Sequence, residues 1–545
     1  MSIATTVSTQ LRNVWTTGVR DNPVVAKELR TRMRDRKGFL VMGGYVLLLG
    51  IVLLIAYYTM WIVSANSLSG SQSLVNSKLG QKLFMVLNWT QTILLALIIP
   101  SLTSGALTLE LEKKTIEMLA LTRLTPGSVV LGKHLTGMLY SMILLMCSLP
   151  LSGMCLMFGG ISPAEVLVTY LLLIAWAFIL SALGVFWSSL FNRTAAAVLM
   201  TYCSVVGYML STAGSGAALL ESLWYGSGTN VNALAMLNPG WAPWGALIKA
   251  SVCGIGLPLY VPPLFLHFVC GAALLFIAAM HVRYLRAEKA LPARVLLIVA
   301  SLFWTWLTVG DASYTRAMGY VAVGPIITIV AAMLFVTFGH VGPIFGTGPM
   351  PSREGRLNVL HFLDVRRMFK SDISGAFCFI MLWAVLEYLT FGITLHWSSA
   401  VSHAKITAAT WASVGKIGLV VMTVVAAMAA VSIFASAVIK QRRNAVAVAV
   451  LVIILMFAGY GLILANFHFG ISRAGSPVWQ LAALWPVTPL IVESNDWTSS
   501  MPVLWWPKKL SWLVVSGVYG ALTLALLLAT PKMAEKFGGV QEEQY

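Results

Sequence analysis

The chain has 545 residues, of which 58% are hydrophobic and only 10% charged, and it carries a formal net charge of +17. An average soluble domain contains about 25% charged residues, so this composition excludes an ordinary globular enzyme and makes lipid the solvent for most of the chain. Because an α-helix satisfies its own backbone hydrogen bonds in hydrocarbon, apolar stretches of roughly 20 residues predict membrane-spanning helices.

Twelve apolar stretches approach this length, of which the seventh is the shortest. They predict spans at residues 39–60, 84–104, 134–158, 164–188, 195–213, 262–284, 293–310, 318–339, 375–395, 412–438, 445–466 and 511–530. The predicted fold class is therefore all-α, a polytopic transmembrane helical bundle of about 12 spans with interfacial amphipathic helices.

Lys and Arg collect on alternate sides of these spans, where 27 of the 36 fall in segments that share one side of the membrane. Cytoplasmic loops retain positive charge during insertion, so this side is the cytoplasm and both termini lie there. The topology predicts a multi-pass protein of the plasma (inner) membrane. Contact with anionic headgroups accounts for the net charge, and a nucleic-acid partner is not required.

A basic amphipathic segment precedes the first span. Asn22 and Pro23 suit a helix start, because Asn caps the first turn and Pro lacks only an N–H that this turn leaves unpaired. One face is apolar, with Val25, Leu29 and Met33. The other face is charged, with Lys27, Arg30, Arg34 and Lys37 and with Glu28 interleaved. The pattern favours a helix in the headgroup plane; the alternative is a plain basic signal for topology.

Two polar residues, Asn88 and Gln91, lie near the start of the second span. Polar side chains in a span either line a path or hydrogen-bond to a neighbouring helix. The second interpretation is the more common one.

The second span is predicted to continue out of the membrane as an exposed helix over residues 108–119. Glu110 with Lys114, and Lys113 with Glu117, stand at i, i+4 and would steady such a helix. Thr125 and Pro126 then suit the start of a new helix, which leads through Lys133 into the third span. The sequence therefore predicts a charged cytoplasmic hairpin.

Residues 127–133 spell a Walker-like pattern, G-x-x-x-x-G-K. A phosphate-binding loop requires a preceding strand and a Ser or Thr after the Lys, whereas here a membrane hairpin precedes and His134 follows. The pattern is interpreted as a chance match, so ATP hydrolysis would have to come from a partner. With no metal cluster, nucleophile elbow or paired carboxylates in the sequence, we expect no catalytic residues, metal site or cofactor, and no enzyme.

Two later features are informative. Residues 162–165, Ser-Pro-Ala-Glu, form a capping box at the start of the fourth span. Glu387 is the clearest acid inside an apolar span, where an unpaired charge is costly, so it must face protein or water. It is either a proton or cation site or, as is more common, a structural hydrogen-bonded glutamic acid.

A weak internal repeat relates the two halves, since residues 184–198 resemble residues 432–446 in character. On this basis residues 1–289 form a six-span unit. Residues 290–352 form a two-span connector with a cytoplasmic loop, and residues 353–545 form a reduced second unit of four spans.

The order of basic helix, two spans, charged hairpin and four further spans resembles the permease subunits of type-2 ATP-binding-cassette (ABC) exporters. Residues 22–32 are similar to that family's connecting helix, and residues 108–133 to its coupling hairpin, which docks onto a separate ATPase subunit. The resemblance covers residues 20–289. It implies a coupling role for Glu110, Glu112, Lys114, Glu117, Arg123 and Lys133.

The resemblance implies export in which closure of an ATPase dimer pushes the hairpin, so that charge reversal at Glu112 and Glu117 should uncouple transport. Residues 353–545 lack a counterpart of segment 110–133, which favours two copies of the chain joined through their first halves. The alternatives are an ion-gradient-driven secondary transporter that uses Glu387 and a non-transporting membrane scaffold subunit.

Overall fold

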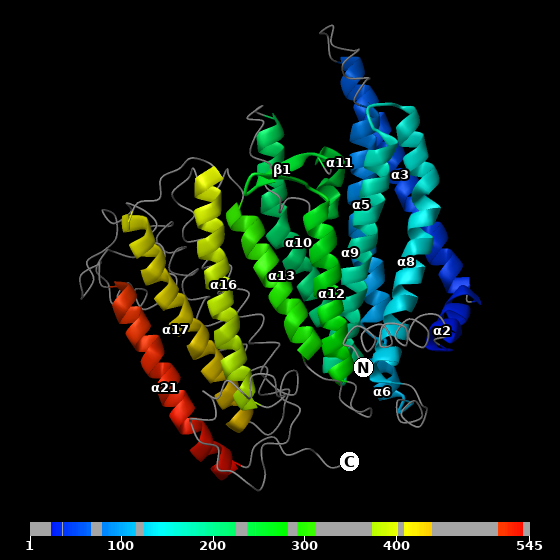
Figure 1. The fold of residues 1–545 in the computed structure, drawn as a ribbon. Coiled ribbons are helices and arrows are strands. Elements are labelled where there is room, and N and C mark those ends of the chain that lie inside the picture. Colours follow the sequence, from blue (N-terminus) through cyan, green and yellow to red (C-terminus); the bar gives the residue numbers. More distant parts are fainter. Residues whose placement is uncertain are drawn as a thin grey trace, which may run out of the picture. The chain divides into compact units, whose positions relative to one another are not determined.

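The structure is a computed structural model that describes residues 23–34, 36–66, 79–115, 125–224, 237–245, 247–281, 291–310, 373–401, 408–438 and 511–537 (Figure 1). These residues are mostly helical. Contacts divide the chain into two compact units. Unit 1 comprises Met1–Ala250, Ile255–Glu288 and Pro292–Leu296, and unit 2 comprises Ser251–Gly254, Lys289–Leu291 and Leu297–Tyr545.

Unit 1 is a helical bundle with one small β-hairpin. Its elements are α2 (Pro23–Arg34), α3 (Arg36–Asn66), α5 (Leu79–Thr103), α6 (Thr108–Glu112), α8 (Pro126–Met157), α9 (Pro163–Leu190), α10 (Thr194–Trp224), η3 (Pro239–Trp241), α11 (Ala242–Gly245), β1 (Lys249–Val252), β2 (Ile255–Pro258) and α12 (Val261–His281), except that the end of β1 and the hairpin turn, Ser251–Gly254, are grouped with unit 2. The remaining helices are α13 (Leu291–Gly310), which begins at the boundary between the units, and α16 (Ile373–Val401), α17 (Ala408–Val438) and α21 (Ser511–Phe537) of unit 2.

Seven of these helices are long and apolar enough to cross a membrane. The apolar stretches are Gly38–Ile62, Leu79–Glu112, Pro126–Met157, Pro163–Leu190, Val261–Ala279, Phe377–Trp397 and Trp512–Thr530, of which the second runs from the start of α5 to the end of α6. Shorter apolar stretches lie in α10, α13 and α17. Predicted spans 318–339 and 445–466 lie outside the described residues. The helical membrane class is therefore supported, while the count of about 12 spans stays a prediction.

Helix α9 is the centre of unit 1, where it packs against α5, α8, α10 and α12. Two glycines allow the helices to approach closely: a Cβ at Gly184 would lie 2.0 Å from Thr103 Oγ1, and one at Gly137 would lie 2.6 Å from Thr103 Cγ2. Large apolar side chains of α3, among them Leu40, Leu54 and Trp61, are exposed, as expected of a helix with a lipid-facing side.

Both helix starts predicted after a turn are confirmed. Thr125 caps α8 by accepting a hydrogen bond from Ser128 N at 3.2 Å, with Pro126 in the first turn. At the start of α9 the Ser162 side chain accepts from Glu165 N, and the Glu165 carboxylate accepts from Ser162 N at 2.8 Å. These local signals fix where the chain re-enters the bundle.

Helix α2 forms where the amphipathic pattern predicts one. The side chains of Lys27, Arg30 and Arg34 are exposed, whereas Val25 and Glu28 are half-buried. A position in the headgroup plane stays a prediction.

In unit 2, α17 packs against both α16 and α21. Most of its buried residues are small or β-branched, among them Val420, Val424, Ala427 and Ala430. Small residues allow helix backbones to approach closely within a membrane. Gly418 serves the same purpose, because a Cβ there would lie 2.4 Å from the ring of Tyr388.

Candidate functional site

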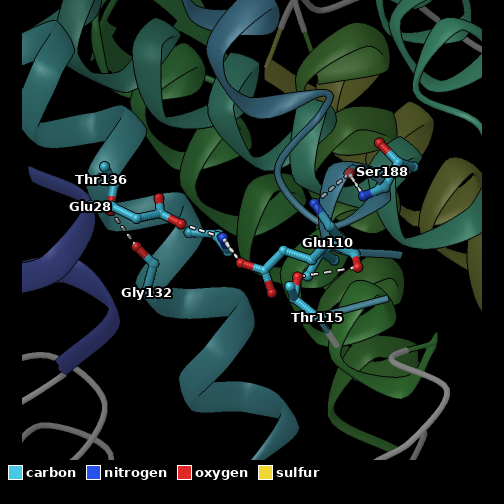
Figure 2. A network of polar contacts seen from close by, with 9 residues as sticks. Glu28, Glu110, Thr115, Gly132, Thr136 and Ser188 are labelled. Carbon is cyan, nitrogen blue, oxygen red and sulfur yellow. Dashed lines mark hydrogen bonds and ion pairs between the residues drawn. The ribbon is translucent and has the colours of Figure 1, made fainter. Parts of the chain in front are cut away.

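Glu110 of the predicted hairpin and Glu28 of the preceding helix meet at Lys133. This lysine lies in the second turn of α8 with its side chain only 6% exposed. Its Nζ forms ion pairs with Glu28 of α2 and with Glu110 Oε1 of α6, the second at 2.5 Å. Figure 2 shows the two carboxylates approaching the lysine from opposite sides. One ammonium group therefore ties together three elements at one end of the unit 1 bundle.

The two carboxylates compensate the free-energy cost of burying the Lys133 ammonium group. An ammonium removed from water requires opposite charge, and Lys133 has two carboxylates whose side chains are 19% and 21% exposed. The apolar residues Leu107, Val129 and Val130 form a buried cluster around the same turn. Removing one member of a buried pair leaves an uncompensated charge at a loss of about 3–5 kcal/mol, so this cluster constrains how far α2, α6 and α8 can separate.

Helix α6 is also fixed to the other side of the bundle by neutral contacts. The backbone N–H groups of Leu107 and Thr108 donate to Ser188 Oγ at the end of α9, at 2.8 and 3.1 Å (Figure 2). Thr194 Oγ1 donates to Thr108 Oγ1 at 3.1 Å. The start of α6 is thus held against the turn between α9 and α10.

Glu112 completes this connection. Its Oε1 accepts a hydrogen bond from Thr194 N at 2.8 Å. Thr194 begins α10, so the carboxylate occupies the N-terminal end of that helix, where unpaired N–H groups and the helix dipole favour negative charge. Glu112 acts here as a capping group supplied by a distant segment.

The prediction of a continuous exposed helix over residues 108–119 is wrong, because α6 ends at Glu112. Lys114 adopts a φ of 56°, its N–H donates to Leu111 O at 3.1 Å, and Thr115 N donates to Glu110 O at 3.0 Å. These two bonds are the Schellman arrangement that closes a helix. The i, i+4 pairing of Glu110 with Lys114 is replaced by the ion pair between Glu110 and Lys133.

The other predicted hairpin residues are partly described. Lys113 and Lys114 are exposed at the end of α6. Glu117 and Arg123 lie outside the described residues, as does the pair of Lys113 with Glu117. The Walker-like residues 127–133 form continuous helix within α8 rather than a phosphate-binding loop, in agreement with their interpretation as a chance match.

Asn88 and Gln91 bond to neighbouring elements of unit 1. Asn88 is fully buried, and its Nδ2 donates to Pro239 O at 2.6 Å, which holds η3 against α5. Gln91 Nε2 donates to the Tyr170 hydroxyl of α9 at 3.4 Å. These contacts match the interpretation of polar residues that join helices.

Glu387 belongs to unit 2 and is not part of the Asn88 and Gln91 contacts. It lies at the midpoint of the apolar stretch Phe377–Trp397 and is fully buried. Thr305 of α13 donates to its Oε1, and one turn away Trp383 Nε1 donates to Ser301 Oγ at 2.7 Å. The second oxygen, Oε2, has no hydrogen-bond partner among the described residues. Among the described residues this carboxyl group accepts from a hydroxyl group and forms no ion pair, an environment that penalises a charged form more than a neutral one.

Sequence reasoning identified Lys133, Glu28 and Glu110 separately but did not pair them. The available signal was their common predicted side of the membrane, since all three fall next to span ends that the sequence predicts to be cytoplasmic. Ser188 and Thr194 gave no signal, because single hydroxyl residues at a helix end are ordinary.

The fold and this site define a helical protein of the membrane with an ion-paired elbow at one end of its first unit. Comparison with known proteins adds no closer assignment: no family model, curated protein or solved structure matches the chain.

Proposed function

We propose that the chain is the membrane-spanning permease component of an ATP-driven ABC exporter, coupled through hairpin 108–133 to a separate ATPase subunit. The observation that carries this proposal is the Lys133 cluster, in which Lys133 of α8 pairs with Glu110 of the elbow, at the end of the apolar stretch Leu79–Glu112, and with Glu28 of the basic helix α2. A motion applied to α6 would reach the spans through these contacts.

The contacts of α6 connect it to helices on two sides of unit 1. Lys133 connects α6 to α2 and α8, while Ser188 and Thr194 connect it to α9 and α10. A push on the elbow by a closing ATPase dimer would therefore tilt several helices together. Rigid-body movement of packed helices between two arrangements is the usual route for such transitions.

The proposal includes a topology of about 12 spans in the plasma (inner) membrane with both termini cytoplasmic. The exposed arginines of α2 would then contact anionic headgroups. Because the sequence of residues 353–545 offers no second hairpin, a pair of ATPase subunits would require two copies of the chain.

The test is purification of the intact chain from membranes in a mild detergent. We expect a soluble subunit with its own phosphate-binding motif to co-purify, and ATP hydrolysis by the complex to differ from that of the isolated subunit. Charge reversal at both Glu112 and Glu117 should abolish that difference at unchanged membrane abundance. A chain that purifies without any ATPase under several detergents would contradict the proposal.

Glu387 favours a second candidate, an ion-gradient-driven secondary transporter, because a buried carboxyl group with one unpaired oxygen is a proton or cation site in such proteins. A single acid without a second charged group among the described residues around it makes this the weaker candidate. Neutralising Glu387 separates the two functions.

A further inference from the structure

The two acidic side chains of α6 each contact another part of unit 1, although Glu112 is exposed and Glu110 is partly buried. Glu110 is ion-paired with Lys133, and Glu112 accepts from Thr194 N at 2.8 Å. Each of these two carboxylates is therefore engaged in a contact within unit 1. These contacts offset part of the negative charge that Glu110 and Glu112 would otherwise present to a partner.

The groups that remain exposed beside them are basic. Lys113 and Lys114 follow Glu112 at the end of α6, and Arg193 immediately precedes Thr194. Because Glu112 bonds to Thr194 N, these three cations belong to one continuous region formed by two separate turns of the chain. Segment 116–124 adds one acid, Glu117, and one base, Arg123, so its sequence leaves the charge balance unchanged.

The position of this region favours a soluble protein over lipid. Figure 1 shows α6 lying farther along the bundle axis than α2 at the same end of unit 1. Helix α2 is the segment whose amphipathic pattern suits the headgroup plane. A surface beyond that level faces water and the macromolecules in it.

We propose that Lys113, Lys114 and Arg193 form a basic docking surface, fixed by the bond from Glu112 to Thr194, that receives an acidic surface of the ATPase subunit. The inference rests on the proposed function and adds the chemistry of the contact to it. Complementary charge across an interface guides association and fixes orientation.

A zero-length carbodiimide cross-link tests the chemistry directly, because it joins a lysine amine only to a carboxylate in contact with it. Applied to the co-purified complex in lipid nanodiscs that contain phosphatidylserine, it should yield peptides that link Lys113 or Lys114 to Asp or Glu of the ATPase. Adducts of these lysines with phosphatidylserine in place of such links would overturn the proposal in favour of a lipid surface.

Charge reversal provides the second measurement. The double variant Lys113→Glu with Arg193→Glu should lower the amount of ATPase retained by about tenfold or more, which corresponds to 1.4 kcal/mol per factor of ten. The matched control is Lys82→Glu with Lys249→Glu, an equal change at exposed positions in the first turn of α5 and in β1, which should retain the ATPase.

The replacements Lys113→Arg and Arg193→Lys keep the charge and should restore retention, which separates charge from folding. Full retention of the ATPase by the reversed double variant would overturn the basic surface alone. Absence of any ATPase from the unmodified complex would overturn the proposed function together with this surface.

Discussion

Two buried ionisable residues, Lys133 in unit 1 and Glu387 in unit 2, are treated by the fold in opposite ways. Lys133 is 6% exposed and meets two carboxylates at the end of its bundle. Glu387 is fully buried, forms no ion pair among the described residues, and accepts a hydrogen bond from the hydroxyl of Thr305. The difference teaches that charge is kept where opposite charge is supplied beside it, and that a neutral form is favoured for a carboxyl group buried without such a partner.

The largest effect is expected from Lys133→Met, which breaks the charged side of this comparison. Glu28 and Glu110 would then face one another without a cation, so we expect a loss of about 3 kcal/mol in the free energy of unfolding, at the low end for a buried pair because both acids are partly exposed. Thermal unfolding in detergent, followed by tryptophan fluorescence, measures it.

Neutralising all three members should recover most of this loss, because a buried ion cluster replaced as a whole by neutral groups is often no less stable. The triple variant Lys133→Met, Glu28→Gln and Glu110→Gln tests this. If the triple variant were as unstable as Lys133→Met alone, packing rather than charge would be the contribution of the lysine.

The Glu387 half of the comparison is tested by Thr305→Val, which keeps the shape of the side chain and removes the hydrogen bond to Glu387. A buried carboxyl group then loses its donor at a cost of about 1–3 kcal/mol. Thr423→Val is a matched control, because Thr423 donates only to backbone carbonyls of its own helix and lies in the same unit. Equal unfolding temperatures for both variants would show that the contact with Glu387 adds no stability.

A smaller effect is expected at Ser188, whose hydroxyl accepts from two backbone N–H groups at the start of α6. Ser188→Ala should lower stability by about 1–2 kcal/mol, since both donors would be left without that acceptor. Ser189→Ala is the control, because Ser189 Oγ donates to Phe186 O within its own helix. Hydrogen exchange of Leu107 and Thr108 should quicken in the first variant alone, and unchanged exchange there would contradict the anchoring of α6.

The sequence was informative wherever the cause is local. The capping box at Ser162 and Glu165 and the restart at Thr125 and Pro126 depend on residues within one turn of each other, and both are confirmed. Apolar length likewise located the helices that could cross a membrane. These features need no knowledge of what the helix packs against.

The Lys133 cluster depends on contacts between segments that are distant in the sequence. Such contacts could not be predicted from the sequence alone. Glu110 was assigned to Lys114 by helical spacing, but Lys114 closes α6 and Lys133, 23 positions away, takes the carboxylate instead. An ion pair with a buried ammonium group outweighs an exposed i, i+4 pair, which contributes only about 0.2–0.5 kcal/mol. The competition is decided by burial, which spacing along one helix does not reveal.

The smallest effect, and the sharpest distinction between the two proposed functions, is expected for Glu387→Gln. Glutamine has the shape of a protonated glutamic acid and can still accept a hydrogen bond from Thr305 through its carbonyl oxygen. If the carboxyl group is neutral and structural, the free energy of unfolding should change by less than about 1 kcal/mol, and ATP-coupled activity should persist. If Glu387 carries a proton or cation across the membrane, stability would still be retained but transport and its dependence on pH would be lost, because an amide does not titrate. Stability and activity measured on the same variant therefore decide whether the acid in unit 2 belongs to the fold or to the mechanism.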